Sequence, residues 1–364
     1  MKASVVEKVG GQFITEEVIL DSPLDLEVLL DVQASGLCHS DLHVAHDGYG
    51  NSFPAVLGHE VAGVVKEVGK QVTEFKVGDH VVGCLIQFCG HCEACLSGHT
   101  YRCLHKEETL RLPNTKPRIT RPDGSVVYQG MGLGGFAEQA LVHQNQLVKV
   151  PKEVPFSRAC ILGCGTITGA GAMINTAKIR PGNTVAVIGL GGVGLNAISG
   201  ARIAGATTII AIDLQPNKLA LAKKFGATHT IHSGEVDAVA AVHEITQGGV
   251  DAAFEIIGLK PTAQQALAMA KEGGGAYLIG LQKPGRLLEI DGSPELIFSQ
   301  KKLQGVWMGS SNFKYDIPMY AKLYLEGRLN LDDLISQEIH IDQVQASYDE
   351  LEKGAIARSI ITAF

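Results

Sequence analysis

Four cysteines lie close together in the first third of the chain, and their type and spacing indicate metal binding. They are Cys89, Cys92, Cys95 and Cys103, in the run CGHCEACLSGHTYRC. In a reducing compartment thiols this close are typical metal ligands rather than disulfide partners. Four thiolates form the closed tetrahedral shell of a structural Zn²⁺ site. A [4Fe–4S] cluster is the alternative, although no proline follows the last cysteine. A DNA-binding finger is not indicated, because paired histidines and a basic helix are missing.

A glycine motif in the middle of the chain predicts dinucleotide binding. The run GLGGVG contains Gly189, Gly191, Gly192 and Gly194. It follows an apolar run directly, as required where a backbone turn approaches a pyrophosphate. Asp213 stands 19 residues after the last glycine of the motif, where an acid holds the ribose hydroxyls. Its charge would repel a 2′-phosphate, so we expect NAD rather than NADP. Lys218 is a candidate for a second ribose contact.

The elements that carry this motif alternate between short apolar runs and amphipathic stretches. We expect strands at 184–190, 207–213, 228–233, 250–257 and 274–281, with a sixth candidate at 302–309. We expect helices after the motif and at 216–225, 236–246 and 261–271. Such a succession predicts an α/β domain with a doubly wound parallel sheet.

The rest of the chain has a different pattern and predicts a second, β-rich domain. Residues 1–165 contain short alternating segments broken by glycine. Residues 107–135 show no periodicity, and an irregular segment of this length is usually functional or part of an interface. Near the end of the chain, helices at 317–325 and 344–353 flank a strand at 338–341. We therefore assign 1–165 and 309–364 to one domain and 166–308 to the nucleotide-binding domain.

Composition limits the classes of partner. The chain has 364 residues, 45% of them hydrophobic, and a formal net charge of −7 at pH 7. The negative charge disfavours nucleic acid and anionic lipid. No uninterrupted apolar run reaches the roughly 18 to 20 residues of a membrane span. No secretory signal pattern is seen at the N-terminus, so we expect a soluble, cytoplasmic protein.

Three separated elements add a second group of possible metal ligands. They are GLCHSDLH, GHEVAGVVKEVG and LGCGTITGAG, which contribute Cys38, His59 and Cys164. A Cys₂His set leaves a fourth zinc position open for catalysis, although spacing alone does not separate such residues from core residues. Together with the four-cysteine loop and GLGGVG, these elements resemble the zinc-dependent alcohol dehydrogenases of the medium-chain dehydrogenase/reductase family over essentially the whole chain.

The resemblance implies a β-rich GroES-like catalytic domain joined to an NAD-binding Rossmann domain, with two Zn²⁺ ions per chain. It implies that Cys38, His59 and Cys164 hold the catalytic zinc and that the four-cysteine loop holds the structural one. Glu60 is implied as a transient ligand. Asp41 is implied as the acceptor of the free imidazole N–H of His59. The two cysteines outside both sets, Cys84 and Cys160, are interpreted as ordinary buried thiols.

The resemblance also implies roles in proton transfer and cofactor binding. Ser40 would bond the substrate hydroxyl, and His43 would pass the proton outward. Thr168 resembles the residue that touches the nicotinamide, and Arg358 resembles a C-terminal arginine that pairs with the pyrophosphate. His39 occupies a position where many relatives carry an arginine for the same phosphate.

The expected activity is NAD-dependent oxidation of primary alcohols, aryl or long-chain ones among them, to the aldehydes. An alternative is a formaldehyde dehydrogenase that requires glutathione or mycothiol, with Glu107, Glu108 and Arg111 placed to bind the charges of a thiol adduct. A non-catalytic NAD-sensing or structural protein is a third reading. We expect a homo-oligomer, a dimer rather than a tetramer.

Overall fold

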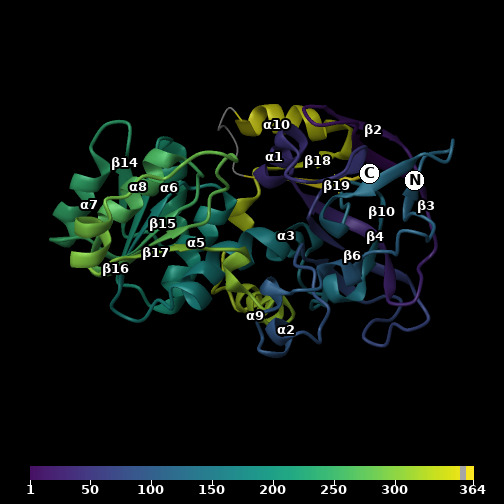
Figure 1. The fold of residues 1–364 in the computed structure, drawn as a ribbon, viewed down its shortest axis with the longest axis horizontal. Coiled ribbons are helices and arrows are strands. Elements are labelled where there is room, and N and C mark those ends of the chain that lie inside the picture. Colours follow the sequence, from purple (N-terminus) through teal and green to yellow (C-terminus); the bar gives the residue numbers. More distant parts are fainter. Residues whose placement is uncertain (353–357) are drawn as a thin grey trace. The chain divides into compact units, whose positions relative to one another are not determined.

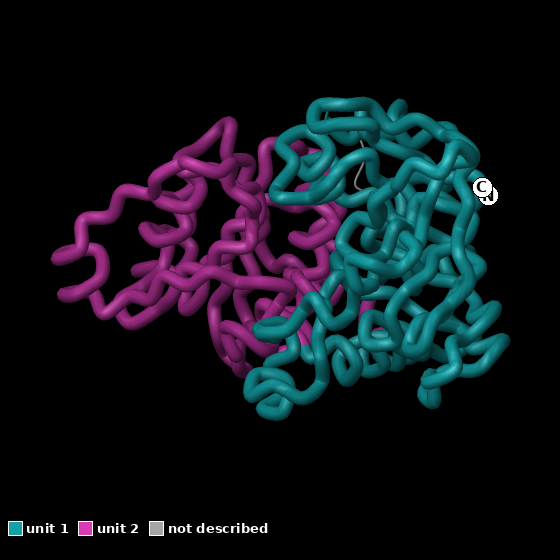
Figure 2. Tube along the Cα trace, turned by 45° about the vertical axis from the view of Figure 1, so that its right-hand side comes forward, with its two compact units in different colours: residues 1–165, 312–327, 331–364 teal, residues 166–311, 328–330 magenta. Residues whose placement is uncertain are grey.

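The computed structural model describes residues 1–352 and 358–364 and divides the chain into two compact units. Unit 1 contains 1–165, 312–327 and 331–364, apart from 353–357, which are not described. Unit 2 contains 166–311 and 328–330. Figure 2 colours the two units separately. Unit 1 therefore combines the start and the end of the chain, whereas unit 2 is nearly continuous in sequence.

Unit 2 contains the predicted parallel sheet. Six described strands are ordered β14-β13-β12-β15-β16-β17, and all neighbouring pairs are parallel. The strands are β12 (Thr184–Ile188), β13 (Thr208–Asp213), β14 (His229–His232), β15 (Val250–Glu255), β16 (Ala270–Leu278) and β17 (Lys302–Gly305). The strand order reverses between β12 and β15, which is where open α/β sheets bind their ligands. The doubly wound prediction is confirmed, and the sixth candidate strand belongs to the sheet (Figure 1).

The connecting helices follow the sequence signals closely. They are α5 (Gly192–Ala204), α6 (Pro216–Phe225), α7 (Ala238–Thr246) and α8 (Lys260–Met269). Helix α5 ends at Gly205, which adopts the left-handed conformation (φ 90°) that a residue without Cβ tolerates best. Helix α6 begins at a proline, as predicted, because its missing N–H needs no partner in the first turn. Predicted and observed ends differ mostly by two residues or fewer and at most by four, because helix ends fray and strand ends depend on pairing.

Unit 1 is built on two sheets. One runs β11-β7-β6-β4-β19-β18, with β10 also paired to β4, and the other runs β2-β1-β5-β9-β8-β3. The strands of the first are β4 (Glu27–Gly36), β6 (Glu60–Val68), β7 (His80–Gly83), β10 (Gln139–His143), β11 (Leu147–Lys149), β18 (Gln337–His340) and β19 (Ser359–Ala363). Those of the second are β1 (Lys2–Val6), β2 (Phe13–Glu17), β3 (Ile19–Leu20), β5 (Ala55–Val56), β8 (Ile119–Thr120) and β9 (Val126–Gln129). The β-rich prediction for this part of the chain is confirmed.

Strand β19 brings the end of the chain into the middle of the first sheet. It pairs with β4 on one side, where Ile360 lies opposite Gly36, and with β18 on the other. In sequence, helices α9 (Phe313–Leu325) and α10 (Val344–Glu352) flank β18, and β19 follows α10. The predicted helix at 344–353 is therefore found, except that Lys353 lies outside the described residues. Strand β19 therefore pairs with the last residues of β4, which ends at Gly36, two residues before Cys38.

The segment 107–135 is more ordered than its lack of periodicity predicted. It contains β8 and β9, which are too short to show an alternating pattern. A buried ion cluster also fixes it to β4. Glu27 accepts from Arg118 Nε at 2.8 Å and from Arg111 Nη2 at 2.6 Å. Burial opposes ionisation of Glu27, but the two guanidinium groups outweigh it and lower the pKa of this carboxyl.

This ion cluster corrects the expectation for Arg111. Each of its three side-chain nitrogens donates within unit 1, to Glu27, to Asp21 at 2.6 Å and to two backbone carbonyls. Removing one partner from such a buried ion pair is costly, because the other charge stays buried. The Arg111 side chain is therefore committed to structure and does not serve as the carboxylate receptor that the thiol-adduct alternative assigned to it.

One helical stretch among the described residues, Phe156–Thr176, is long and apolar enough to cross a membrane. It comprises α3 (Phe156–Ile161), α4 (Ile167–Gly171) and the π-helical turns around α4. Most of its apolar window is buried inside the structure. Burial in the protein core accounts for this composition without a lipid environment.

Candidate active site

Cys38 stands directly before helix α1 (His39–Asp47), in unit 1. Its backbone is extended (φ −106°, ψ 144°), and its side chain caps none of the described N–H groups of the helix. The thiol is thus left for other partners. A helix N-terminus carries partial positive charge, which favours a thiolate at this position. The side chain is buried, so its partners must come from the protein or from a bound ion.

His59 belongs to the same buried group of side chains as Cys38. It lies between β5 and β6, and its side chain is fully buried. Its Nε2 lies 3.2 Å from Sγ of Cys164, and its Nδ1 lies 2.9 Å from Oδ1 of Asp41. The same Asp41 oxygen accepts the backbone N–H of Gly58 at 3.0 Å. The predicted Asp41 contact thus faces one imidazole nitrogen and leaves the other toward the thiols.

Cys164 completes the cluster from the π-helical turn 162–166. The ligand atoms of Cys38, His59, Glu60 and Cys164 all lie within 4.8 Å of one another. A hydrogen bond from Cys164 lowers the pKa of Cys38 well below its ordinary value, despite the opposing effect of burial. The same hydrogen bond, together with burial, raises the pKa of Cys164 well above it. The two neighbouring thiols therefore differ in proton affinity, and a divalent cation would suit two thiolates and a neutral imidazole.

Glu60 lies beside this cluster but is paired with an arginine. Its Oε2 is 3.0 Å from Nη1 of Arg358, and its Oε1 accepts the backbone N–H of Gly165 at 3.1 Å. A Cβ at position 36 would overlap Oε2 of Glu60, so Gly36 makes room for the carboxylate. Burial raises the pKa of Glu60 to about 7, although Arg358 opposes the rise. The sequence analysis missed this pair; the pyrophosphate role of Arg358 stays a prediction.

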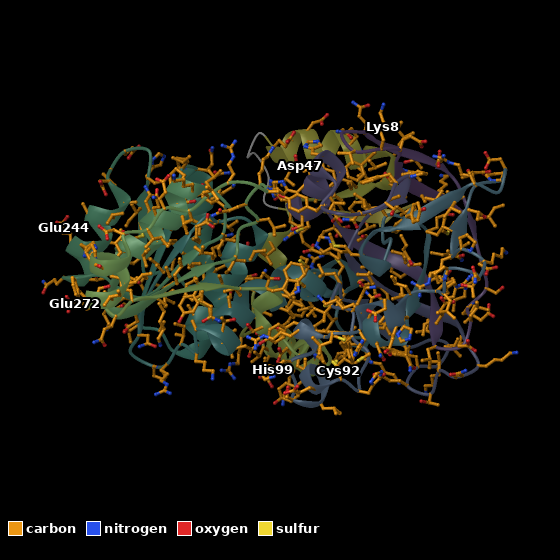
Figure 3. All side chains as sticks on the ribbon, viewed as in Figure 1. Lys8, Asp47, Cys92, His99, Glu244 and Glu272 are labelled. Atoms are coloured by element: carbon orange, nitrogen blue, oxygen red, sulfur yellow. The ribbon has the colours of Figure 1, made fainter. Side chains whose placement is uncertain are left out.

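The four-cysteine loop forms a second cluster in unit 1, around the short helix α2 (Glu93–Leu96). Sγ of Cys92 lies 3.5 Å from Sγ of Cys95 and 3.9 Å from Sγ of Cys103, and Cys89 and Cys95 are 3.9 Å apart. A tetrahedron with Zn–S bonds of about 2.3 Å has edges of about 3.8 Å. The sulfur positions therefore fit a tetrahedral zinc ion. Figure 3 labels Cys92 and His99 in this loop.

The protonation of these thiols supports the same conclusion. Backbone N–H groups, first that of Leu104, lower the pKa of Cys92 to about 6. Burial instead raises the pKa of Cys95 to about 12 and also raises that of Cys103. The protein alone thus stabilises the thiolate of Cys92 and disfavours those of Cys95 and Cys103. A cation at the centre is the partner that would let all four ionise.

The glycine motif of unit 2 forms the turn from β12 to α5, and its glycines differ in what a Cβ at each position would contact. Gly189 has φ 96°, and a Cβ there would lie 2.7 Å from Ile257. A Cβ on Gly194 would overlap the carbonyl oxygen of Gly189, so this position keeps the helix close to the strand. A Cβ on Gly191 would meet no atom within 4 Å. Gly191 and the buried Gly192 at the start of α5 therefore form an open turn whose N–H groups fit a pyrophosphate.

Asp213 ends β13 beside this turn, and its carboxylate is held by two backbone donors. Oδ2 accepts the N–H of Leu190 at 2.8 Å, and Oδ1 accepts that of Gln215 at 2.9 Å. Each oxygen keeps a lone pair for a ribose hydroxyl. Lys218 is half-buried in the first turn of α6. The structure therefore brings together the acid and the glycine turn, as the motif predicts.

Thr168 lies in α4, in unit 2, and its hydroxyl donates to Sδ of Met308 at 3.6 Å. Met308 begins an unusual turn in which three successive residues have positive φ: 48° at Met308, 60° at Gly309 and 50° at Ser310. Two of them carry side chains, which makes the conformation strained. The hydroxyl of Thr176 donates to that of Ser310 at 2.8 Å and ties the turn to the same helical stretch. No sequence pattern signalled this turn.

The predicted proton-transfer residues share helix α1. Ser40 and His43 are half-buried, and His39 is exposed at the start of the helix. The ring of His43 packs edge-on against Tyr49, with ring centroids 6.5 Å apart. His39, Ser40 and His43 therefore follow the ligand Cys38 within a single helix. Their roles toward substrate and cofactor stay predictions.

Comparison with known proteins agrees with both units. A family model described as the alcohol dehydrogenase GroES-like domain matches residues 25–152, and one described as zinc-binding dehydrogenase matches residues 192–324. The NDMA-dependent alcohol dehydrogenase of Amycolatopsis methanolica is 36% identical, covering 99% of this chain and 98% of the relative. The S-(hydroxymethyl)glutathione dehydrogenase of Paracoccus denitrificans is 33% identical, covering 99% of each chain.

A solved structure gives the same result. The benzyl alcohol dehydrogenase of Acinetobacter calcoaceticus matches with a TM-score of 0.91 and 34% identity, covering 100% of this chain and 99% of the other. The similarity extends over the full length of both chains. This chain therefore belongs to the zinc-dependent alcohol dehydrogenases of the medium-chain dehydrogenase/reductase family, which use zinc and a nicotinamide cofactor.

Proposed function

We propose that this enzyme oxidises primary alcohols, aryl and long-chain ones among them, with NAD as acceptor and two zinc ions per chain. One observation carries the proposal: Cys38, His59 and Cys164 place two sulfurs and one nitrogen within 4.8 Å of one another in a buried cluster. Three protein ligands leave one zinc position for the substrate, whereas the four-cysteine cluster leaves none.

The chemistry divides between the bound groups and the chain. When bound, zinc would act as a Lewis acid toward the alcohol oxygen and the nicotinamide would accept a hydride from carbon. The chain contributes alignment and the exclusion of water. Ser40 is proposed to accept the hydrogen bond of the substrate hydroxyl. His43, one helical turn later, is proposed to exchange the departing proton with solvent, since an unperturbed imidazole titrates at about 6.5.

A His43→Gln variant tests the proton path. We expect kcat/KM for alcohol oxidation to fall several-fold near pH 7, because glutamine cannot accept the proton. The deficit should shrink at higher pH as hydroxide or buffer takes over. Ser40→Ala should lose nearly all turnover at every pH. The measurement is a pH–rate profile, with His46→Gln, an exposed histidine on the same helix, as control. A His43→Gln profile that follows wild type throughout would make His43 a bystander.

Cofactor preference is proposed to depend on Asp213. Asp213→Gly removes the ribose acceptor and the charge that repels a 2′-phosphate, so we expect the NAD/NADP ratio of kcat/KM to shift by about 2 to 4 kcal/mol. Because the Asp213 carboxylate also accepts the N–H of Leu190, a second variant is needed. Asp213→Asn keeps an acceptor for that N–H and removes only the charge, so it should shift the ratio in the same direction but less. A wild-type enzyme that prefers NADP contradicts the proposal.

The substrate class is tested by measuring NADH formation with a panel of alcohols. Rates that are highest with primary aryl or long-chain alcohols support the proposal. A thiol-dependent formaldehyde dehydrogenase is the second candidate, favoured by the relative named S-(hydroxymethyl)glutathione dehydrogenase. Formaldehyde oxidation that requires added glutathione or mycothiol would establish it instead. Metal analysis of the same preparation should return two zinc ions per chain.

The oligomeric state and the cellular location of the enzyme are also proposals. We propose a cytoplasmic homodimer. Sedimentation of the purified protein decides between dimer and tetramer, and a monomer at working concentration contradicts both.

A further inference from the structure

The backbone around Cys38 is hydrogen-bonded by residues from the C-terminal part of the sequence. The N–H of Leu37 donates to the carbonyl of Ser359 at 3.0 Å. The carbonyl of Leu37 accepts from Nη1 of Arg358, also at 3.0 Å. The carbonyl of Cys38 accepts from the hydroxyl of Tyr348 at 3.1 Å. Three backbone groups of Leu37 and Cys38 are therefore hydrogen-bonded by residues of α10, of β19 and of the position before β19.

Tyr348, one of these three hydrogen-bond partners, has a tightly packed side chain. It is fully buried in α10, and its ring stacks on Phe13 with centroids 4.9 Å apart and planes inclined by 25°. A second aromatic ring, Phe136, lies at 6.4 Å. Because the ring is held on two sides, the position of the hydroxyl is fixed. Burying a phenol hydroxyl without a hydrogen-bond partner costs free energy, so the hydrogen bond to the Cys38 carbonyl stabilises this arrangement.

The orientation of the Cys38 thiol depends on that peptide. Cys38 is the N-cap residue of α1 rather than part of a helix or strand, and its carbonyl also accepts the N–H of Asp41 at 3.1 Å. The carbonyl and the side chain of Cys38 are both attached to its Cα, so a displacement of the backbone at Cys38 would move Sγ relative to His59 and Cys164. A donor on the carbonyl therefore restrains the sulfur without touching it.

We propose that Tyr348 is a positioning residue for Cys38 and that its hydroxyl controls how firmly unit 1 retains the catalytic zinc. The inference rests on the proposed assignment of Cys38, His59 and Cys164 as zinc ligands. It adds a residue that lies 310 positions from Cys38 in sequence and that no metal-binding motif contains.

The test is a Tyr348→Phe variant of the zinc-loaded enzyme, which keeps the ring and its packing. The matched control is Tyr320→Phe. Tyr320 is also fully buried in unit 1, but its hydroxyl has no hydrogen-bond partner among the described residues. Zinc release to an excess of a colorimetric chelator is followed in time, and the catalytic site is also loaded with Co²⁺ to record its absorption bands.

For Tyr348→Phe we expect zinc to leave the catalytic site about 3- to 10-fold faster than from wild type, at or below the roughly 10-fold lower bound for direct partners of metal ligands, because Tyr348 acts through the backbone. The thiolate-to-cobalt band should shift, whereas release from the four-cysteine site should not change. Tyr320→Phe should match wild type in both readouts. Equal release rates and cobalt spectra for wild type and Tyr348→Phe would overturn the inference. So would an equal acceleration at both zinc sites, since that indicates general destabilisation.

The design separates this inference from the proposed function. If wild type takes up no metal at the Cys38 cluster, the ligand assignment fails and the inference fails with it. If wild type holds the metal and oxidises alcohols while Tyr348→Phe releases zinc at the wild-type rate, the function stands and the inference alone is wrong.

Discussion

Cys164→Ser is expected to yield a folded protein that oxidises alcohols about a thousandfold more slowly than wild type, or slower, since a Lewis acid supplies several kcal/mol. Serine is a poor zinc ligand at neutral pH, because its hydroxyl stays protonated. The ligand set would fall from three protein donors to two. The glycine turn and Asp213 belong to unit 2, so nicotinamide cofactor binding should persist. The measurements are kcat, zinc content and cofactor binding by titration.

Cys160→Ser is the matched control for that variant. Cys160 is also fully buried, and its thiol donates to the backbone carbonyl of Ser157 at 3.4 Å. A serine hydroxyl can make the same bond, so this variant should retain near-normal turnover and zinc. Near-normal activity in Cys164→Ser would show that the catalytic ligands have been assigned wrongly.

Cys95→Ser should act on stability rather than on chemistry. The four-cysteine loop contains only the short helix α2 and a three-residue 3₁₀ turn, Thr100–Arg102, so metal binding supplies much of its folding energy. Three thiolates form a weaker site, and we expect the melting temperature to fall by about 10 °C. Thermal unfolding and metal analysis measure both effects, and the zinc lost should be close to one ion per chain.

Cys84→Ser serves as the control for the loop. Cys84 is fully buried outside both clusters, and burial raises the pKa of its thiol to about 12, so it behaves as a neutral side chain. Its replacement should leave the zinc content unchanged. A Cys95→Ser protein with wild-type melting temperature and zinc content would exclude a structural metal in the loop.

The fold of unit 2 could be predicted well because its signals are local. The strand before the glycine motif, the proline that begins α6 and the spacing to Asp213 each depend on residues within about one helix or strand of one another. The segment 107–135 shows the limit of this approach. Strands β8 and β9 contain two and four residues, too few to produce a period, and their order depends on ion pairs with Glu27.

The two metal clusters also differ in whether their ligands are close together in the sequence. The four cysteines lie within one loop, so their spacing alone predicted a site. Cys38, His59 and Cys164 come from three distant elements and were grouped only by family resemblance. The partners of Glu60 and Cys38 in the C-terminal region, Arg358 and Tyr348, could not be found, because no periodicity or spacing rule links residues more than 290 positions apart. Their signal is a contact that exists only in the folded chain.

The position of β19 between β4 and β18 has a consequence for the order of events during synthesis. Residues 166–311 are consecutive and can fold as soon as they leave the ribosome, since their contacts are mutual. The edge of β4 at Gly36, in contrast, stays open until β19 is made, because its partner Ile360 is translated more than 300 residues later. During that interval the backbone at Leu37 and Cys38 lacks the hydrogen bonds from Ser359, Arg358 and Tyr348. Stable metal loading of this cluster should therefore follow the synthesis of β19, whereas the four-cysteine loop can capture its ion earlier in translation.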